Sequence, residues 1–426
     1  MTMAIANRID GEDLRLQMRR LGEAARQASV VLALTPRADK DRALRAAASS
    51  LRSHRQKILD ANAKDMSEAR NLSLALRDRL MLDEKRVEAM AKSLEDIANL
   101  PDPIGTVLAE WERPNGLKIA RVRVPLGVIG IIYESRPNVT ADASALCLKS
   151  GNAAILRGGS ESFHSSNAIL DCMHEGLRSA NLPESAVQLV PTRAREAVGI
   201  MLSMSDVIDI IIPRGGRSLI ERVVAESRIP VIKHLEGICH VFVSAKADPE
   251  IARRVVLNSK MRRTGVCGAA ETLLVAEGAK KILPVILEDL IAAGCEIRGD
   301  AATQKLDKHV IPASEKDWDT EYLDAIIAVK IVKDVDEAIQ HVNTHGSHHT
   351  DSIVTNDAAE AEKFLAQVDS GIVLHNASTQ FADGGEFGMG AEIGISTGKL
   401  HARGPVGTEQ LTSYKYVVRG NGQVRP

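Results

Sequence analysis

One cysteine stands in a segment whose residue types could support nucleophilic chemistry. Cys267 lies between Gly265 and Gly268, and Arg262 and Arg263 come shortly before it. Glycine has no side chain, so a substrate carbonyl can approach the sulfur closely. Two neighbouring positive charges favour the thiolate, which is the attacking form of cysteine. Cys267 is therefore a candidate nucleophile, and the competing interpretation is a small buried apolar residue in a tight turn.

Apolar runs alternate with helical patterns in the middle of the chain. The runs 127–133, 153–156, 187–190, 207–212 and 229–232 indicate strands buried on both faces. Such strands, separated by helices, predict an α/β fold with a doubly wound, five-stranded parallel sheet. Ligands bind at the carboxyl ends of the strands in these sheets.

Two of those strand ends carry an arginine followed by two glycines. They read Arg157-Gly158-Gly159-Ser160 and Arg214-Gly215-Gly216. Backbone amides and helix starts in such segments can hold phosphate groups. The G-x-G-x-x-G fingerprint is absent, so a standard Rossmann site is not supported.

Other segments supply supporting elements. Residues 12–34 show the apolar spacing of an amphipathic helix, and helical patterns continue to Pro101. Alternating residues on either side of Pro114-Asn115-Gly116 predict a hairpin over 107–124, and a strand candidate over 414–418 could pair with it. A second strand–helix series follows residue 237 and contains Cys267, whereas 312–320 has the composition of a surface connection.

Composition excludes several classes of function. The 426 residues carry a net charge of -2 and only 3% aromatic residues, so nucleic acid is not an expected partner. No apolar run approaches the ~20 residues of a membrane span. The five cysteines are odd in number and form no C-x-x-C pair, which favours a reducing, cytoplasmic location.

The segment 345–351 contains a cluster of histidines, His345, His348 and His349. Histidines are common metal ligands, so a metal site is one interpretation. No cysteine or carboxylate spacing completes a ligand set, and a solvated loop before a strand is favoured. We therefore predict no metal site.

Several stretches together resemble a known family. They are VPLGVIGIIYESRPNVTADA, LCLKSGNAAILRGGSE, DIIIPRGG, IPVIKHLEGICHVFV, TGVCGAAETLLV, HTDSIVTND and FGMGAEIGISTGKLHARGP. Between Val124 and Gly420 the chain resembles the gamma-glutamyl phosphate reductases of the aldehyde dehydrogenase superfamily. The resemblance implies NADPH-dependent reduction of L-glutamyl 5-phosphate to L-glutamate 5-semialdehyde and phosphate, a step of proline biosynthesis. The hairpin at 107–124 and the strand at 414–418 lack a partner within their own domain, and because the superfamily uses such elements between subunits, they predict a homo-oligomer. A transient complex with glutamate 5-kinase, which makes the unstable substrate, is a further partner to test.

The resemblance gives roles to individual residues. Cys267 stands at the position of the nucleophile that forms a thioacyl intermediate. Asn138 matches the side chain that stabilises the oxyanion together with the cysteine N–H. Glu321 matches the glutamate that holds the nicotinamide ribose. Many members have asparagine after the cysteine, and here Gly268 takes its place, so no side-chain donor is available there.

Substrate anions call for cationic partners near the thiol. Planar guanidinium groups match the oxygens of phosphate and carboxylate. Solvated surface arginine is an equally good interpretation of any one candidate. The candidates are Arg136, Arg262, Arg263 and Arg403, with Asn376, Ser378 and Thr379 as a second set.

Cofactor preference is predicted from the end of the second strand. NAD-preferring members of the superfamily carry a lysine there and a glutamate three residues later. Arg157 and Ser160 occupy those positions here, and arginine can pair with a 2′-phosphate that a carboxylate would repel. In the competing interpretation, Arg157 ends a strand in water and Ser160 caps a helix.

Two other functions compete with the reductase. A hydrolytic aldehyde dehydrogenase needs a general base, for which the superfamily uses the glutamate of an E-L-G-G segment. The matching segment is His234-Leu235-Glu236-Gly237, with histidine at that position. A cofactor-binding protein without catalysis is the other interpretation, and the combination of Cys267, Asn138 and the glycine-rich strand ends speaks against it.

We expect four parts in the chain. Residues 1–106 and 124–233 would form an NADPH-binding domain with an N-terminal helical layer. Residues 234–375 would form an α/β catalytic domain with the cysteine. Residues 107–123 and 404–426 would form a β oligomerisation element, and 376–403 a loop region returning to the active site.

Overall fold

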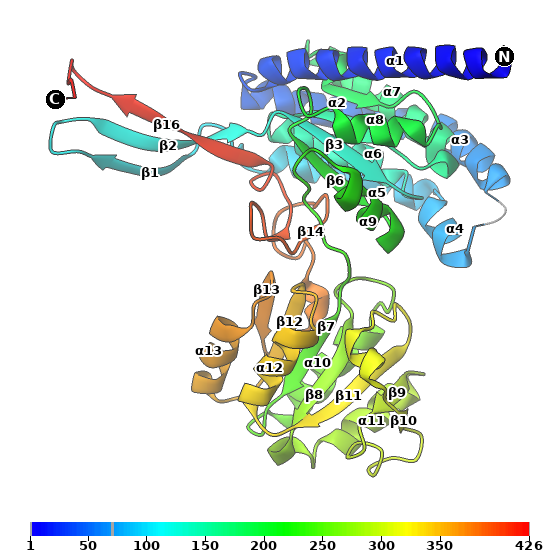
Figure 1. Ribbon diagram of the computed structural model, residues 1–426, viewed down its shortest axis with the longest axis vertical. Coiled ribbons are helices and arrows are strands. Elements are labelled where there is room, and N and C mark those ends of the chain that lie inside the picture. Colours follow the sequence, from blue (N-terminus) through cyan, green and yellow to red (C-terminus); the bar gives the residue numbers. More distant parts are fainter. Residues whose placement is uncertain (1, 70–71, 426) are drawn as a thin grey trace. The chain divides into compact units, whose positions relative to one another are not determined.

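A computed structural model describes residues 2–69 and 72–425. The chain divides into two compact units. Unit 1 contains the described residues up to Lys233, together with Gly388–Gly394 and the residues from Val406 onward. Unit 2 contains His234–Phe387 and Ile395–Pro405. Figure 1 shows the elements of each.

A layer of helices opens unit 1. The first helix begins before the predicted range, and α2 packs against both α5 and the later helix α7 (Phe163–Ser179). The Asp83 carboxylate accepts a hydrogen bond from Arg86 N and caps the start of α5. The helices are α1 (Thr2–Leu32), α2 (Arg37–Ser53), α3 (Arg55–Glu68), α4 (Leu74–Leu80) and α5 (Glu84–Asn99).

A parallel sheet forms the core of unit 1. Its order is β5-β4-β3-β6, and every residue of the two central strands is buried. Helices follow the strands, as in the predicted alternation. The strands are β3 (Val128–Tyr133), β4 (Ala153–Arg157), β5 (Val187–Leu189) and β6 (Ile210–Arg214). The helices that follow these strands, besides α7, are α6 (Asn138–Lys149), α8 (Glu196–Ser203) and α9 (Arg217–Glu226).

The prediction of a fifth strand over 229–232 is wrong, because this segment lies beside β6 without forming a full strand. The segment makes a single parallel bridge, between Val231 and Ile211, and no full strand. Ile211 N donates to Pro230 O, and Ile232 N donates to Ile211 O. Pro230 has no N–H of its own, so it cannot extend the ladder. The sheet therefore has four strands in the described chain.

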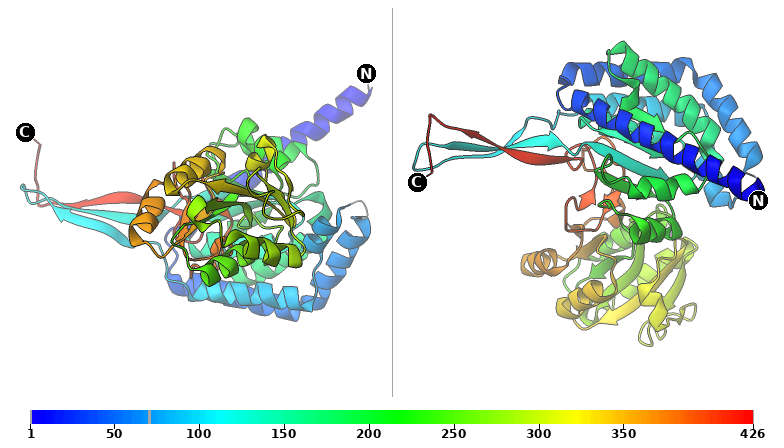
Figure 2. Two further views of the ribbon diagram at one scale, coloured as in Figure 1. Left: turned by 90° about the horizontal axis from the view of Figure 1, so that it is seen from below. Right: turned by 45° about the horizontal axis from the view of Figure 1, so that its top comes forward.

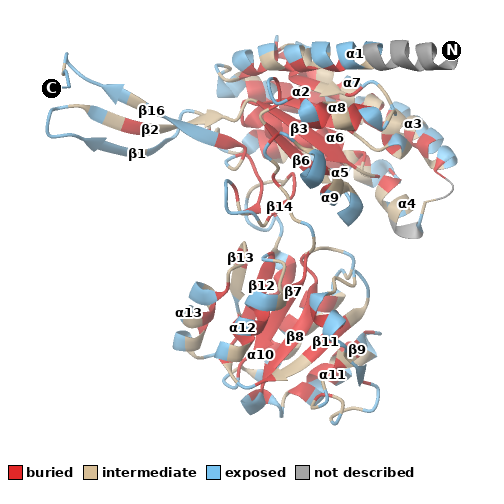
Figure 3. Cartoon of the chain, in the orientation of Figure 1, coloured by how far each residue is buried: buried red, intermediate tan, exposed pale blue. Residues whose placement is uncertain are grey.

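The predicted hairpin and C-terminal strand form a separate antiparallel ribbon. Strands β1 (Val107–Glu112) and β16 (Thr412–Arg419) pair with opposite edges of β2 (Lys118–Pro125). Figures 1 and 2 show this ribbon extending away from the helices of unit 1. Figure 3 shows that β1 and β16 are largely exposed. The pairing predicted from sequence is confirmed.

Unit 2 contains a seven-stranded parallel sheet in the described chain. Its order is β10-β9-β11-β8-β7-β12-β13. The strands are β7 (Cys239–Val243), β8 (Ala270–Ala276), β9 (Glu296–Gly299), β10 (Ile311–Pro312), β11 (Ile326–Val332), β12 (Thr350–Val354) and β13 (Ile372–His375). The helices are α10 (Pro249–Met261), α11 (Leu283–Ala292), α12 (Val335–His345) and α13 (Ala358–Gln367).

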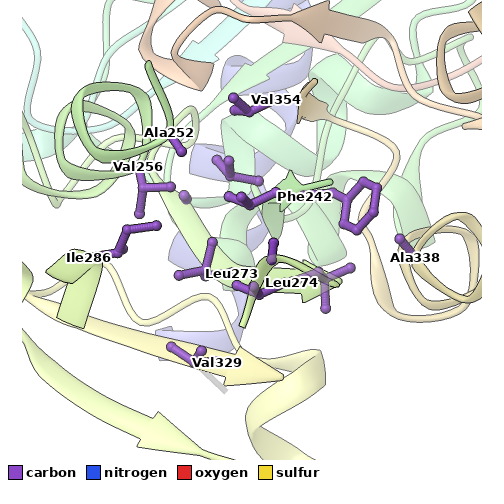
Figure 4. Packing of buried hydrophobic residues seen from close by; sticks show 14 of the residues in the cluster. Phe242, Ala252, Val256, Leu273, Leu274, Ile286, Val329, Ala338 and Val354 are labelled. Atoms are coloured by element: carbon purple, nitrogen blue, oxygen red, sulfur yellow. The ribbon is translucent and has the colours of Figure 1, made fainter. Parts of the chain in front are cut away.

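The core of unit 2 lies on the faces of its sheet. Phe242, Leu273, Leu274 and Val329 from neighbouring strands pack together, as Figure 4 shows, and all four are at most 1% exposed. Figure 3 shows the buried residues gathered along both parallel sheets. The segment 312–320 is more than the expected surface connection, because Trp318 is buried in a short 3-10 helix, η4 (Glu315–Asp319).

The remaining elements are short. Strands β14 (Ile395–Ser396) and β15 (Gly404–Pro405) form a two-stranded sheet in the expected loop region. None of the described helices combines the length and apolar character that crossing a bilayer requires.

Candidate active site

Cys267 lies on a turn between α10 and β8. Within the described chain it differs from the other cysteines, which are all buried, whereas Cys267 is partly exposed. Burial raises the pKa of the thiols that lie inside the core, such as Cys239, and this disfavours their thiolates. Exposure therefore singles out Cys267 as the cysteine that a substrate can reach.

The backbone of Cys267 is held by close packing. A β-carbon at Gly237 would fall 2.0 Å from the Cys267 carbonyl oxygen, so only glycine fits there. The same carbonyl accepts a hydrogen bond from Cys239 Sγ at 3.0 Å. A β-carbon at Gly268 would lie 3.0 Å from Thr379 O. This packing leaves little room for the asparagine that many superfamily members have after the cysteine.

Two residues that were predicted to bind substrate, Ser378 and Thr379, instead pack beneath this turn. Ser378 and Thr379 are at most 5% exposed. Thr379 N donates to Ser259 Oγ, which in turn lies 3.2 Å from Ser378 Oγ. Gln380 Nε2 donates to Arg263 O and fixes the start of the turn. In this placement Ser378 and Thr379 stabilise the loop and do not line an open surface.

A buried ion pair lies beside the turn and was not predicted from sequence. Lys260 Nζ donates to Glu271 Oε2 at 2.5 Å, and both side chains are fully buried. Leu323 N lies 3.3 Å from Glu271 Oε1. Burial raises the pKa of Glu271 to about 7, although Lys260 opposes this shift. The sequence does contain a signal for this pair. Glu271 directly precedes the apolar run 272–275, and a charge buried with such a run needs a partner of opposite charge.

Glu321 reaches the same region. Its Oε1 accepts a hydrogen bond from Gly237 N at 2.9 Å. Burial raises the pKa of the Glu321 carboxyl, while the bond from Gly237 acts in the opposite direction. The predicted ribose ligand is thus linked through Gly237 to the backbone of Cys267.

Two histidines lie close to the Cys267 thiol. His234 Nδ1 is 2.8 Å from the carbonyl oxygen of Ile395, and its ring meets that of His349 edge to face at 5.2 Å between centroids. His349 is fully buried, contrary to the expected solvated loop. Ligand atoms of His234, Cys267 and His349 all lie within 4.8 Å of one another. Their distance along the chain concealed this arrangement from sequence analysis.

The candidate arginines of unit 2 differ in their surroundings. Arg262 and Arg263 are exposed, and no acidic partner lies within ion-pair distance among the described residues. Arg403 instead pairs with Asp369 at 2.8 Å. The side-chain amide of Asn376 both accepts from and donates to the backbone of Thr355. Arg262 and Arg263 are therefore the candidates that remain available to a substrate anion.

In unit 1, two carboxylates organise the carboxyl edge of the parallel sheet. Glu134 Oε2 accepts from Gly216 N at 2.9 Å, and a β-carbon at Gly215 would fall 2.5 Å from that oxygen. Glu161 Oε1 accepts from both the backbone N and the Oγ of Ser135. The helix start predicted to hold phosphate already has a carboxylate on its N–H.

The two arginines of this edge are largely enclosed. The guanidinium of Arg157 donates to the carbonyls of Gly158 and Arg193. Burial lowers the pKa of Arg157. Nε of Arg157 and Nε of Arg214 are buried without a hydrogen-bond partner in the described chain. Cationic groups with unused donors, at the ends of strands β4 and β6 on either side of β3, fit an anionic dinucleotide.

Two further predicted residues are placed within unit 1. Ser160 is exposed at the start of a short 3-10 helix, η1 (Ser160–Ser162). Asn138 begins α6, and its Nδ2 donates to Asp142 Oδ2 at 3.0 Å. Asp142 thereby orients the amide, which has a second N–H to donate. Arg136 is half-buried just after β3.

Comparison with known proteins identifies the class. The model of the aldehyde dehydrogenase family matches residues 12–305 and 309–417. The chain therefore belongs to the aldehyde dehydrogenase family. An acetylating aldehyde dehydrogenase from Geobacillus thermoglucosidasius shares the fold, with a TM-score of 0.71 at 16% identity over 97% of this chain and 98% of that one.

Its near relatives within the family carry one name. The chain is 66% identical to a gamma-glutamyl phosphate reductase of Paramagnetospirillum magneticum, over 97% of this chain and 99% of the relative. It is 62% identical to the protein of that name in Rhodospirillum rubrum, over 99% of each. The crystal structure of gamma-glutamyl phosphate reductase from Thermotoga maritima has a TM-score of 0.94 at 45% identity, covering 96% of this chain and 100% of that one. The chain is an oxidoreductase of this branch of the family.

Proposed function

We propose that the chain catalyses the NADPH-dependent reduction of L-glutamyl 5-phosphate to L-glutamate 5-semialdehyde and phosphate, in proline biosynthesis. One observation carries the proposal. Cys267 is the partly exposed cysteine of a chain whose other thiols are buried, and it follows two arginines that have no acidic partner among the described residues. The name shared by its relatives at 62–66% identity supports this substrate.

The first chemical step belongs to Cys267. Its thiolate attacks the acyl carbon, the new C–S bond gives a thioester, and phosphate leaves with the electrons of the broken C–O bond. Negative charge develops on the carbonyl oxygen during this step. The Cys267 N–H and the Asn138 amide are the donors that we assign to it. Arg262 and Arg263 supply positive charge for the departing phosphate.

The second step reduces the thioester to the aldehyde. Bound NADPH supplies the hydride. We assign its phosphates to Arg157, Ser160 and the segment Arg214–Gly216, where Glu134 must release the Gly216 N–H to make it available, and its nicotinamide ribose to Glu321. His234 stands where hydrolytic members have a glutamate base, so water lacks a carboxylate to activate it against the thioester. The acyl group is thereby kept for reduction. Hydride addition to the acyl carbon gives a thiohemiacetal on Cys267. Its C–S bond then breaks, the aldehyde is released, and the electrons return to the sulfur as the thiolate.

Partners follow from the same chemistry. The exposed ribbon of β1, β2 and β16 supports a homo-oligomer. An acyl phosphate is an unstable substrate, which favours direct delivery from glutamate 5-kinase in a transient complex. Free cysteines throughout the described chain fit a cytoplasmic location.

The reaction in reverse gives the decisive experiment. Purified enzyme is mixed with glutamate semialdehyde and NADP, with and without phosphate, and NADPH formation is followed. We expect turnover that requires phosphate. Turnover without phosphate would identify a hydrolytic dehydrogenase, and none in either mixture a binding protein. Cys267→Ser should lose turnover and still bind NADPH, and near-normal turnover in that variant would contradict the role of the thiol.

A further inference from the structure

The Cys267 thiol and the two imidazoles beside it come from segments that precede adjacent strands. His234 lies shortly before β7, Cys267 before β8 and His349 immediately before β12. These strands are neighbours in the order β8-β7-β12 and run parallel. Their amino ends therefore share one edge of the sheet. The fold brings two imidazoles and one thiol together at this edge, where each offers a ligand atom within 4.8 Å of the other two.

Hydrogen bonds orient the two rings. A carbonyl oxygen can only accept, so the bond between His234 Nδ1 and Ile395 O requires the proton on Nδ1. The neutral ring then has its lone pair on Nε2. A metal-binding histidine typically donates its other N–H to a backbone carbonyl in this way. His349 is oriented by Nδ1 as well, which lies 2.9 Å from Thr350 Oγ1.

The donor set selects a particular kind of metal. Two imidazole nitrogens and one thiolate suit Zn²⁺, whereas Mg²⁺ and Ca²⁺ require oxygen ligands. Tetrahedral zinc with Zn–S of ~2.3 Å and Zn–N of ~2.0 Å needs ligand atoms roughly 3.3–3.6 Å apart. The ligand atoms of the three side chains now lie within 4.8 Å of one another, so a modest movement of the side chains would bring them into that range. His349 is fully buried, whereas Cys267 is partly exposed on its turn. The movement therefore falls to the Cys267 side chain, whose sulfur can rotate toward the two imidazoles.

We propose that His234, Cys267 and His349 form a zinc site with three protein ligands and an open fourth position. This reverses the expectation of no metal. Zinc held there occupies the Cys267 sulfur, so it prevents attack on the acyl phosphate and inhibits the enzyme reversibly. The site places the nucleophile under control of free zinc, and it protects the thiol from alkylation while the metal is bound.

The second sulfur nearby provides a competing ligand set. Cys239 Sγ lies 3.7 Å from His349 Nδ1, on the side of the ring that faces Thr350. A site using Cys239 would leave Cys267 reactive. The two arrangements are distinguished by the sulfur that the metal contacts.

The experiment uses the full chain and reads metal binding directly. Zinc affinity is measured by competition with a chromophoric chelator, and Co²⁺ is used as a probe because a cobalt–thiolate bond gives a charge-transfer absorption band. We expect one zinc per chain. His234→Asn and His349→Asn should each weaken binding at least roughly tenfold. His348→Asn is the matched control, since this neighbouring ring bonds to Asp369 O instead and should leave the affinity unchanged.

The cysteine variants and the unmodified chain complete the test. Cys267→Ser should abolish the cobalt–thiolate band, and Cys239→Ser should retain it. In the unmodified chain, zinc should slow alkylation of Cys267 by iodoacetamide, a readout that needs no variant to fold. Absence of this protection, unchanged affinity in both folded histidine variants, or loss of the band in Cys239→Ser would overturn the proposal. None of these measurements depends on turnover, so failure of the proposed reaction would be seen separately.

Discussion

Gly237 and Cys267 are in direct backbone contact: a β-carbon at 237 would lie 2.0 Å from the Cys267 carbonyl oxygen and 2.6 Å from its Cα. Gly237 also donates its N–H to Glu321. One residue without a side chain thus positions both the proposed nucleophile and the proposed ribose ligand.

Gly237→Ala should displace the Cys267 turn, because the clashing atoms belong to backbone and cannot rotate away. Misplacing a nucleophile by about 1 Å costs roughly 100-fold in rate, so we expect a loss of that order in kcat. Gly265→Ala is the matched control on the same turn, since its new β-carbon would meet only Leu323 O at 3.8 Å. Steady-state kinetics on both variants measures the difference, and equal kcat values would show that the contact does not position the thiol.

Arg262→Ala and Arg263→Ala should raise the Michaelis constant for the acyl phosphate. Each removes a charge-assisted hydrogen bond, so roughly tenfold is expected for the residue that binds phosphate. Arg254→Ala, an exposed arginine on the preceding helix α10, should have no effect. Kinetics with varied substrate tests this. If neither variant differs from the Arg254 control, the anion is held elsewhere.

Glu271 makes the stability of unit 2 depend on pH. Its pKa is raised from 4.5 to about 7 in the folded chain, so the folded state binds the proton more tightly than the unfolded state. The stability from this group is greatest below the unfolded pKa and is lost as the pH rises through the folded pKa. Relative to Glu271→Gln, the parent chain should therefore lose unfolding free energy between pH 4.5 and about 7. Urea unfolding measures it, with the exposed Glu288→Gln as control. If the unfolding free energy instead rose over this pH range, the attraction of Lys260 for the ionised Glu271 carboxylate would outweigh the effect of burial.

The exposed ribbon should mediate association between copies of the chain. Trp111 and Tyr416 meet edge to face at 6.2 Å and are 38% and 56% exposed. Sedimentation should show a species heavier than the 45.9 kDa chain. Tyr416→Glu should shift it toward the monomer, because association would bury the new charge. Leu400→Glu, at a side chain 95% exposed in unit 2, should not. A monomeric parent chain at micromolar concentration would exclude the interface.

Ser160→Glu should reduce the use of NADPH far more than that of NADH. A carboxylate at this exposed position would repel a 2′-phosphate, and we expect the ratio of the two kcat/KM values to fall at least roughly tenfold. Ser203→Glu, on α8, controls for added charge. Kinetics with each cofactor gives the ratio. An unchanged ratio would show that the end of β4 does not read the 2′ position.

Much of the fold could be predicted because burial leaves a direct trace in the sequence. Strands β3, β4 and β8 are buried along their whole length, and each contributes an apolar run to the sequence, at 128–133, 153–156 and 273–276. Strand β9 has only Ile297 and Gly299 buried among four residues, so no apolar run marks it in the sequence. The run 229–232 illustrates the converse. It is apolar, but Pro230 has no N–H to donate, and no full strand forms.

The candidate site could be predicted only where it is local. Cys267 and its glycines lie within four residues of the chain, and their types alone indicated chemistry. The burial of His349 depends on which strands become neighbours, and so does its contact with His234. Sheet order is a tertiary property, which no spacing along the chain encodes. The assignment of a solvated loop to His349 was wrong for this reason.

The connectivity of the two units governs the order in which they can be completed during synthesis. Unit 1 needs Gly388–Gly394 and the residues from Val406 onward, which the ribosome produces after nearly all of unit 2. Strand β16 is among the last segments to emerge, so one edge of β2 stays unpaired until then. The three-stranded ribbon, through which we propose that copies of the chain associate, is therefore completed only after unit 2 has been synthesised.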